Sequence, residues 1–413
     1  MKNYKKIVFI TSSGHMLECY DVTLYGFFAV LLSPIFFPSN NFIASMIGTF
    51  GAFAAGFIMR PIGGIIFGHI GDKVGRKYSF LLSIVLMTIP TIGIGCLPSY
   101  ETIGITSPIL LILFRLIQGI ALGGEYGGAT VFINEHIKEN KPGFAGSIIV
   151  TLGFAGAIIG TILGAIFTQD FMPVWAWRVP FFLGGVFGII VFYFRIQLQE
   201  TPEFSSLCSE KNTEYYPIFA VLKKDLKNVL CCAGIGMHTI TPFYISVIFI
   251  NLYYDYKFKI SMSNTLAINT GIMFLWVLTL PFAGYIADKF NRKKIMLYSA
   301  ICTCVVSIPA FYTMLNTDTF LIFFLCQLLI SFSSIPYVAV TSSILPLLFP
   351  KVSRYSGVAF SFSLGVALCG GTSPLIATTL INSGITIGPA IYLFISGVVG
   401  YLSVYFASNY RYN

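Results

Sequence analysis

The sequence predicts an all-α membrane protein in which twelve transmembrane helices form two pseudo-symmetric six-helix bundles. Three observations support this prediction: an apolar composition, twelve long apolar stretches, and a charged loop motif that occurs twice. Of the 413 residues, 56% are apolar and only 10% are charged, whereas soluble domains carry about 25% charged residues. Most of the chain is therefore expected to lie in a lipid bilayer.

The apolar stretches are long enough to cross a bilayer, which takes about 20 helical residues. They cover residues 17–37, 43–69, 78–98, 107–134, 144–168, 177–198, 229–253, 264–287, 295–315, 319–348, 354–381 and 388–407. The one long polar stretch lies in the middle, with six spans on each side. We therefore expect an N-terminal bundle over residues 1–198, a cytoplasmic linker over 199–228 and a C-terminal bundle over 229–413.

Basic residues are distributed unevenly among the predicted loops. All but five of the 25 Lys and Arg residues lie at the two termini or in the loops after even-numbered spans; the exceptions are Lys257, Lys259, Arg178, Arg60 and Arg115. Cytoplasmic loops carry the excess of Lys and Arg, so both termini are predicted to be cytoplasmic. This orientation accounts for the net charge of +9 without a nucleic-acid partner.

The loop after the second span recurs after the eighth. The first copy reads GHIGDKVGRK from Gly68 to Lys77, and the second reads GYIADKFNRK from Gly284 to Lys293, 216 residues later. Gly, Asp, Lys, Arg and Lys coincide at identical spacing. A duplicated six-helix unit explains this coincidence, and membrane transporters are commonly built from such repeats.

The first copy resembles the loop signature of the major facilitator superfamily, and the second departs from it only where Asn291 replaces a glycine. Further motifs resemble the metabolite–proton symporter branch and, within it, bacterial proline/betaine transporters. They are RPIGG from Arg60, GGEY from Gly123, WRVPF from Trp177 and ETPEF from Glu200. Two motifs differ: the first span lacks both aromatic flanks of the usual Glu-Trp-Tyr/Phe-Asp-Phe, and Phe362-Ser363 replaces an aromatic–Asn pair.

The resemblance implies a monomeric secondary active transporter of a bacterial inner membrane. It would import a small carboxylate-bearing organic solute, similar to proline or betaine, together with protons. A dicarboxylate such as α-ketoglutarate, or a facilitator without proton coupling, are the alternatives. The sequence has no phosphate-binding loop for a nucleotide and its nine cysteines are scattered, so we expect neither an enzyme nor a metal site or organic cofactor.

Ionisable residues inside spans are candidates for function, because each costs at least ~2.5–3.5 kcal/mol to insert. They are Glu18 and Asp21 in span 1, Arg60 in span 2, and Arg115 and Glu125 in span 4. Spacings of four, three and four residues place Gly14, Glu18, Asp21 and Tyr25 on one helix face.

We expect Glu18, Asp21, Arg60 and Glu125 to meet near the membrane middle, with Arg115 further outside. Burial favours the protonated form of a carboxyl group and a nearby Arg favours the ionised form, so such a group could load and release protons. Arg60 offers a fork for a substrate carboxylate. Alternatively, Arg60 pairs permanently with Asp21 or Glu125 and holds helices together.

The repeated motif is expected at the cytoplasmic surface, away from the substrate. The resemblance implies that Gly68, Asp72 and Arg76, and more weakly Asp288 and Arg292, act as a gate, with Asp72 contacting a neighbouring helix end in the outward-open state. An aspartate is favourable at a helix N-terminus. The alternative is that these are solvated turn charges that only set the topology.

Overall fold

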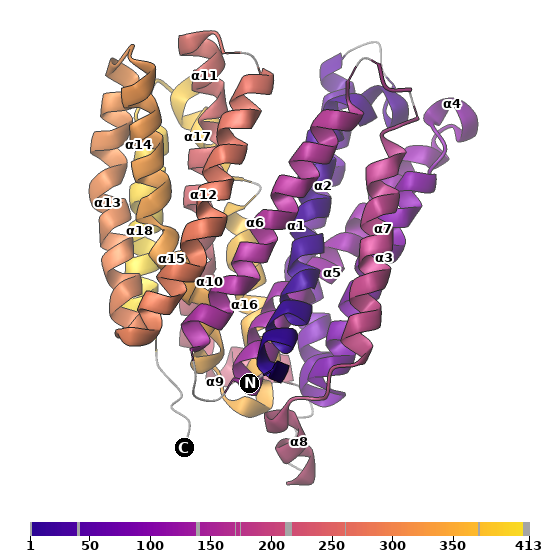
Figure 1. Cartoon of the computed structure of the whole chain (residues 1–413), viewed down its shortest axis with the longest axis vertical. Coiled ribbons are helices and arrows are strands. Elements are labelled where there is room, and N and C mark those ends of the chain that lie inside the picture. Colours follow the sequence, from indigo (N-terminus) through magenta and orange to yellow (C-terminus); the bar gives the residue numbers. More distant parts are fainter. Residues whose placement is uncertain are drawn as a thin grey trace.

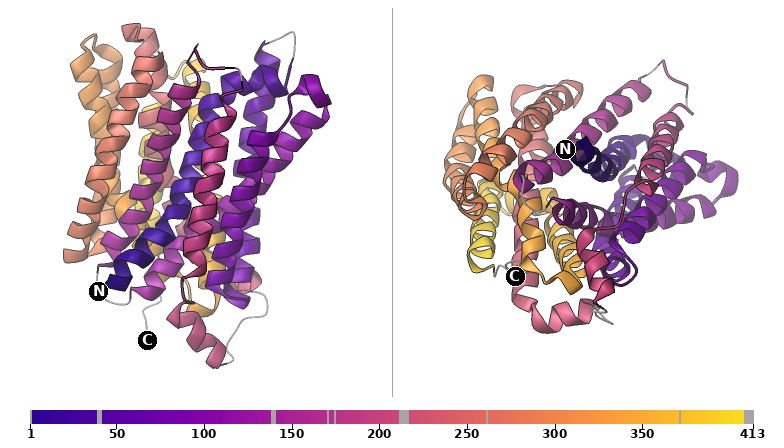
Figure 2. Two further views of the ribbon diagram at one scale, coloured as in Figure 1. Left: turned by 45° about the vertical axis from the view of Figure 1, so that its right-hand side comes forward. Right: turned by 60° about the horizontal axis from the view of Figure 1, so that its bottom comes forward.

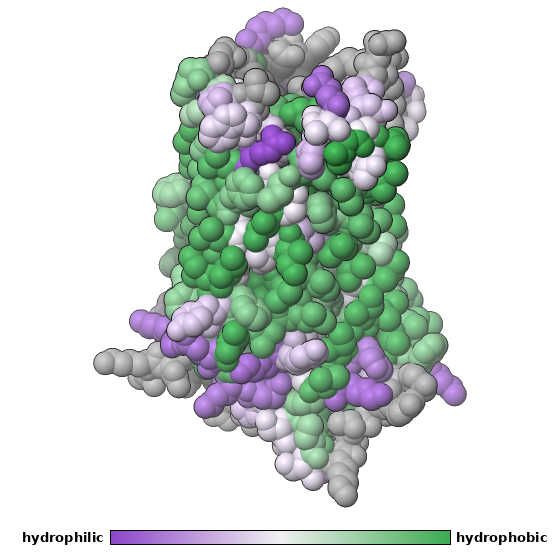
Figure 3. Space-filling view, turned by 90° about the vertical axis from the view of Figure 1, so that its right-hand side faces the viewer, coloured by the Kyte–Doolittle hydropathy of each residue, from purple (hydrophilic) through white to green (hydrophobic). Residues whose placement is uncertain are grey.

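The structure, a computed structural model, describes residues 2–38, 42–137, 141–169, 171–173, 175–210, 217–260, 262–370 and 372–407. All regular elements in these ranges are helical, and they stand side by side with their long axes roughly parallel (Figure 1). On the face shown in Figure 3, a broad apolar band covers the middle of the molecule, and polar residues gather toward its two ends. This distribution is the one that a bilayer requires of a multi-span protein.

The first group of helices carries the six predicted N-terminal spans. It comprises α1 (Lys2–Phe36), α2 (Phe42–Lys73), α3 (Arg76–Cys96), the short α4 (Tyr100–Ile103), α5 (Thr106–His136), α6 (Pro142–Phe167) and α7 (Arg178–Ile196). Two short helices follow within the predicted linker, α8 (Pro202–Ser209) and α9 (Pro217–Lys224). They lie at the end of the molecule where α1 begins and α18 finishes (Figure 1).

The second group carries the remaining predicted spans, several of them in pieces. It comprises α10 (Leu226–Phe243), the π-helix η1 (Tyr244–Phe249), α11 (Asn251–Phe258), α12 (Met262–Lys289), α13 (Arg292–Asn316), α14 (Phe320–Ser333), α15 (Ile335–Ile344), the 3-10 turns η2 (Leu345–Leu348) and η3 (Lys351–Ser353), α16 (Arg354–Cys369), α17 (Ser373–Asn382) and α18 (Gly388–Phe406). Seen from the end that carries α8 and α9, the two groups face each other (Figure 2).

In the part of the chain that the structure describes, eleven segments are long and apolar enough to cross a membrane. They coincide with the second to the twelfth predicted spans. The first predicted span lies in α1, which is 35 residues long and packs along α6. The predicted fold class is therefore confirmed, and α1 extends well before residue 17, where the apolar pattern begins.

Prolines divide two of the predicted spans. The span over 319–348 breaks at Ser334, and Pro336 occupies the first turn of α15. The span over 354–381 breaks after Cys369, and Pro374 occupies the first turn of α17. Proline is tolerated in a first turn because its missing N–H would have no helical partner there.

The two groups meet along two equivalent contacts, α2 with α16 and α6 with α12. Motif glycines allow the close approach in both. A Cβ atom on Gly68 would lie 2.6 Å from Ser356 Cα, and one on Gly284 would lie 2.7 Å from the carbonyl oxygen of Gly143. The repeated motif thus places a glycine at each equivalent helix crossing.

Candidate functional site

Within the predicted spans of the N-terminal group, buried charges form three ion pairs. Glu18 pairs with Arg60, Asp21 with Arg115, and Glu125 with Arg195. Each pair joins two different helices, and all six side chains are at least nine-tenths buried. Pairing offsets the desolvation that each charge suffers inside the bundle. The sequence-predicted residues are thus all engaged, although they do not form one cluster.

The Glu18–Arg60 pair lies near the second group of helices. Arg60 Nη2 donates to Glu18 Oε1 at 2.8 Å, and His15 Nδ1 lies 2.9 Å from Glu18 Oε2. Across the interface, Tyr244 of η1 lies within electrostatic range of both members of the pair. π-Helical turns are rare and frequently occur at functional sites. The pair therefore belongs to the region between the two groups.

The bond to Glu18 is the single hydrogen bond of the Arg60 guanidinium among the described residues. The Arg60 side chain is also the most accessible of the three arginines, at 8% exposed against 2% for Arg115 and none for Arg195. A guanidinium has five N–H donors. Arg60 thus retains capacity to bind a further anion.

Asp21 lies in a closed polar cluster within the N-terminal group. Arg115 Nη1 donates to Asp21 Oδ2 at 2.9 Å, while Gln118 Nε2 and Thr91 Oγ1 donate to Oδ1 at 2.9 and 3.0 Å. Arg115 also donates to Gln118 Oε1 at 2.8 Å, and its guanidinium stacks over the Tyr25 ring at 4.2 Å. This cluster links α1, α3 and α5 and holds Arg115 in place.

Glu125 pairs with a residue that the sequence reasoning missed. Arg195 of α7 donates through both Nη atoms to Glu125, one bond measuring 3.0 Å, and Ser83 Oγ donates to the same carboxylate at 2.7 Å. The sequence prediction places Arg195 among the cytoplasmic loop charges. Its position could have identified it as a candidate for a buried ion pair, because Arg195 falls inside the predicted span 177–198. Glu125 therefore forms its ion pair with Arg195 and not with Arg60, so the four residues expected to meet do not form one network.

The alternative pairing for Arg60 also differs from the structure. Neither Asp21 nor Glu125 contacts Arg60, because Arg115 and Arg195 occupy those carboxylates. Arg60 turns instead to Glu18, one helical turn before Asp21 on the same face of α1. The depth of a residue in the membrane does not distinguish Glu18 from Asp21 as the partner of Arg60. Residues three apart on one helix differ by only ~4.5 Å along its axis.

At the end that carries α8 and α9, Asp72 binds the start of α16 in the other group. Its two carboxylate oxygens accept from the backbone N–H groups of Tyr355 and Ser356 at 3.1 and 2.8 Å. Arg76 donates to Asp72 at 2.6 Å and to the carbonyl oxygen of Lys351 at 2.8 Å. A carboxylate at a helix N-terminus is favourable for the dipole and for the unpaired N–H groups.

Asp288 makes the equivalent contact in the opposite direction. It accepts from the backbone N–H groups of Gly143 and Phe144, at the start of α6, at 2.7 and 2.8 Å. Arg292 donates to the carbonyl oxygen of Ser343 at 3.2 Å. The two copies of the motif thus tie each group to the other by the same contact.

The departure at Asn291 has a local explanation. Gly75 has φ +145°, a backbone conformation that favours glycine. Asn291 has φ −74° and its side chain accepts from the backbone N–H of Lys294, which caps the N-terminus of α13. Asparagine is one of the preferred N-cap residues. The second turn therefore has its own geometry and still positions Asp288.

Further charges close the same end of the molecule. Glu135 of α5 lies 3.5 Å from Arg76 Nε and 3.2 Å from Arg354 Nη1 of the other group, and it accepts from Thr201 Oγ1 at 2.6 Å. Lys351 forms a 2.8 Å ion pair with Glu203 of α8. These partners are distant in sequence, so no local pattern predicted them.

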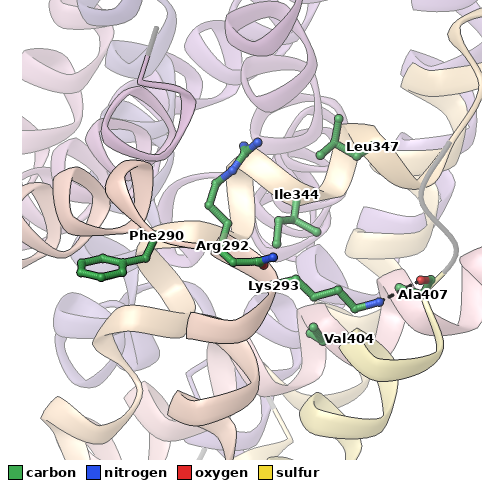
Figure 4. Close-up of a pocket in the computed structure, with 8 residues that line it drawn as sticks. Phe290, Arg292, Lys293, Ile344, Leu347, Val404 and Ala407 are labelled. Atoms are coloured by element: carbon green, nitrogen blue, oxygen red, sulfur yellow. Dashed lines mark hydrogen bonds between the residues drawn. The ribbon is translucent and has the colours of Figure 1, made fainter. Parts of the chain in front are cut away.

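A separate open cavity lies beside the second motif copy (Figure 4). Asn291, Arg292 and Lys293 line it together with Ile344, Leu347 and the end of α18. Lys293 extends along it and donates to the carbonyl oxygens of Tyr405 and Ala407, both at 3.3 Å. None of the residues that line this cavity belongs to the three buried ion pairs, so we do not assign the solute to it.

Comparison with known proteins places the chain in a family. The sequence profile described as "Sugar (and other) transporter" matches residues 7–228. The proline/betaine transporter of Salmonella typhimurium is 31% identical over 412 residues, which covers 97% of this chain and 82% of the relative. A glycine betaine/proline/ectoine/pipecolic acid transporter of Dickeya dadantii, OusA, is 32% identical with the same coverage.

Solved structures share the fold at lower sequence identity. The proton:xylose symporter XylE of the major facilitator superfamily, bound to 6-bromo-6-deoxy-D-glucose, superimposes with a TM-score of 0.81 at 16% identity, covering 98% of this chain and 94% of XylE. The human organic anion transporter MFSD10 gives 0.68 at 16% identity, with 98% and 97% covered. With the helical fold, the duplicated motif and the full-length relatives in agreement, the chain belongs to the sugar (and other) transporter family of the major facilitator superfamily.

Proposed function

We propose that this transporter imports a small zwitterionic solute that carries a carboxylate, of the proline or betaine kind, together with protons. The observation that supports this most directly is the Arg60 guanidinium, which faces the region between the two groups and makes one hydrogen bond, to Glu18. A solute carboxylate can bind such a fork through two parallel hydrogen bonds. The names of the full-length relatives support the same solute class.

A single available cation favours a zwitterion over a dicarboxylate. Arg115 is held by Asp21 and Gln118. Arg178 lies at the start of α7, donates to the carbonyl oxygen of Leu97 at 2.9 Å and stacks on Trp177 at 4.4 Å. A second carboxylate would therefore lack a partner beside Arg60, and burying an unpaired charge is costly.

Transport would proceed by alternating access between the bundles over 1–198 and 229–413, with residues 199–228 as a cytoplasmic linker. In this proposal Asp72 and Asp288, with Gly68, Arg76 and Arg292, hold the inner end closed, and breaking their contacts with α16 and α6 opens it. The positive-inside distribution of Lys and Arg supports an inner-membrane orientation with both termini in the cytoplasm.

Proton coupling would reside in the buried carboxylates of the N-terminal bundle, at Asp21 and Glu18. Each carboxylate faces an arginine and lies inside an apolar bundle. Displacement of the arginine would favour protonation, since a buried carboxylate without a cation is costly to keep ionised. The C-terminal group supplies no comparable ion pair in its described spans.

Uptake of labelled proline, betaine and α-ketoglutarate into proteoliposomes tests the proposal. We expect proline or betaine to accumulate when the outside is acidic and to equilibrate only when no pH gradient is imposed. Accumulation of α-ketoglutarate alone would favour the dicarboxylate alternative. Uptake indifferent to the gradient, for a solute that does enter, would identify a facilitator and reject proton symport.

A further inference from the structure

His15 lies beside the proposed solute site, and the function proposed above does not use it. It is on α1, one turn before Glu18, and its Nδ1 lies 2.9 Å from Glu18 Oε2 while Arg60 holds Glu18 Oε1 at 2.8 Å. Glu18 is thus shared between a permanent cation and a group that can become one. Histidine is the side chain whose charge ordinarily changes between pH 5 and 8.

Apart from Glu18, the neighbours of His15 are a thiol, an aromatic ring and a glycine. Its Nε2 lies 3.7 Å from Cys19 Sγ, and its ring lies 5.0 Å from the ring of Tyr126 on α5. On α6 the facing residue is Gly153, where a Cβ atom would approach the imidazole to 2.7 Å. The side chain is 12% exposed, so protein atoms do not enclose the imidazole completely.

The same position connects the two groups of helices. Tyr126 stacks on Phe362 of α16 at 4.4 Å, and its hydroxyl lies 2.8 Å from Ser342 Oγ of α15. On η1, Tyr244 lies within electrostatic range of Glu18 and Arg60. His15 therefore contacts a residue, Tyr126, that itself packs against the partner group, and a movement of the two groups would change those contacts.

We propose that the proton that accompanies solute binding adds to His15, with the ionised Glu18 as its partner, rather than to a carboxylate itself. This inference rests on the proposed function and deepens it. When the solute carboxylate takes over the Arg60 fork, Glu18 loses its cation. A proton from the external water then adds to His15 Nε2, whose Nδ1–H already donates to the Glu18 carboxylate, and an imidazolium–carboxylate pair replaces the arginine pair. Proton release to the cytoplasm returns Glu18 to Arg60 after the solute leaves.

Thermodynamic linkage determines the direction in which solute affinity changes with pH. If solute binding favours protonation of His15, protonation of His15 must tighten solute binding by the same factor. Uptake of one linked proton changes the apparent affinity by up to about tenfold per pH unit. Affinity for the solute is therefore expected to fall as the external pH rises through the titration range of His15.

The test compares the pH dependence of the KM for betaine in wild type and His15→Asn. Asparagine can still donate to Glu18 but takes up no proton, so the slope should vanish while uptake at acidic pH persists. His69→Asn, at a half-buried position near the inner end of α2, is the matched control and should keep the wild-type slope. A wild-type slope in His15→Asn would overturn the role of His15 and leave proton symport intact.

A second measurement needs no variant. Diethyl pyrocarbonate modifies neutral imidazole, so the rate at His15, followed by mass spectrometry against pH, reports its protonation. Betaine should move the midpoint of that curve to higher pH at His15 and leave His69 unchanged. An unmoved midpoint, in protein that binds betaine, would contradict the inference. If no solute binds or enters the wild-type protein, the proposed function fails instead.

Discussion

Asp72 and Asp288, the equivalent acids of the two motif copies, each bind the start of a helix in the opposite group. Asp72 accepts two backbone hydrogen bonds at the start of α16, and Asp288 accepts two at the start of α6. The contacts are reciprocal, so the end that carries α8 and α9 is held by one arrangement used twice. Two helix–helix crossings at motif glycines accompany them.

Removing one of these charges should loosen one helix start. Asp72→Asn weakens two charge-assisted hydrogen bonds, which shifts the equilibrium toward the open inner end by roughly 1–3 kcal/mol. Hydrogen exchange followed by mass spectrometry should show faster exchange in the first turn of α16. Asp288→Asn is the matched control and should accelerate exchange in the first turn of α6 instead. If exchange accelerated equally in the first turns of α16 and α6 in both variants, the two aspartate contacts would not act independently.

Arg60→Gln should abolish uptake while the protein still inserts into the membrane. The loss of a charge-assisted fork corresponds to roughly 10- to 150-fold in affinity. Arg60→Lys keeps the charge without the fork and should raise KM with a smaller change in kcat. The double variant Glu18→Gln with Arg60→Gln removes both charges. It therefore distinguishes the effect of losing the solute-binding cation from the effect of leaving the Glu18 carboxylate buried without a partner. Near-normal uptake by Arg60→Gln would remove Arg60 from the site.

Arg195→Met should destabilise the fold, because it leaves Glu125 buried without a cation. Breaking a buried pair from one side costs about 3–5 kcal/mol. Thermal unfolding of the purified protein should show a clearly lower midpoint, and adding Glu125→Gln should recover much of the loss. Arg178→Met, which removes a partly exposed bond to a backbone carbonyl, is the control with an effect of about 1 kcal/mol. An unchanged midpoint for Arg195→Met would show that the pair is not structural.

Much of the fold and part of the site could be predicted from the sequence. Length and apolarity locate spans well, since the bilayer imposes both. The rarity of charges inside spans singled out Glu18, Asp21, Arg60, Arg115 and Glu125 as functional candidates, and all five are buried. Their partners depended on tertiary packing: Arg195 reaches Glu125 from α7, and Glu135 reaches Arg354 across the two groups. Helical spacing contains no information about which residue of another helix lies opposite.

Gly153→Ala offers an independent approach to His15. An added methyl group would meet the imidazole and the Cys19 sulfur at 2.7 and 3.1 Å, so His15 must move away from its contact with Glu18. We expect the pH dependence of KM to flatten as in His15→Asn. Gly26→Ala is the matched control, because a Cβ atom there meets nothing within 4 Å. A wild-type pH profile in Gly153→Ala would indicate that the His15–Glu18 contact is dispensable.

The most direct test of the central claim is the current that betaine evokes in proteoliposomes on a solid-supported membrane. Betaine carries no net charge, so symport with a proton must move positive charge inward with each solute molecule. We predict an inward positive current that grows as the external pH falls and disappears in Arg60→Gln. Accumulation of betaine without any current, and without acidification of the lumen, would contradict it.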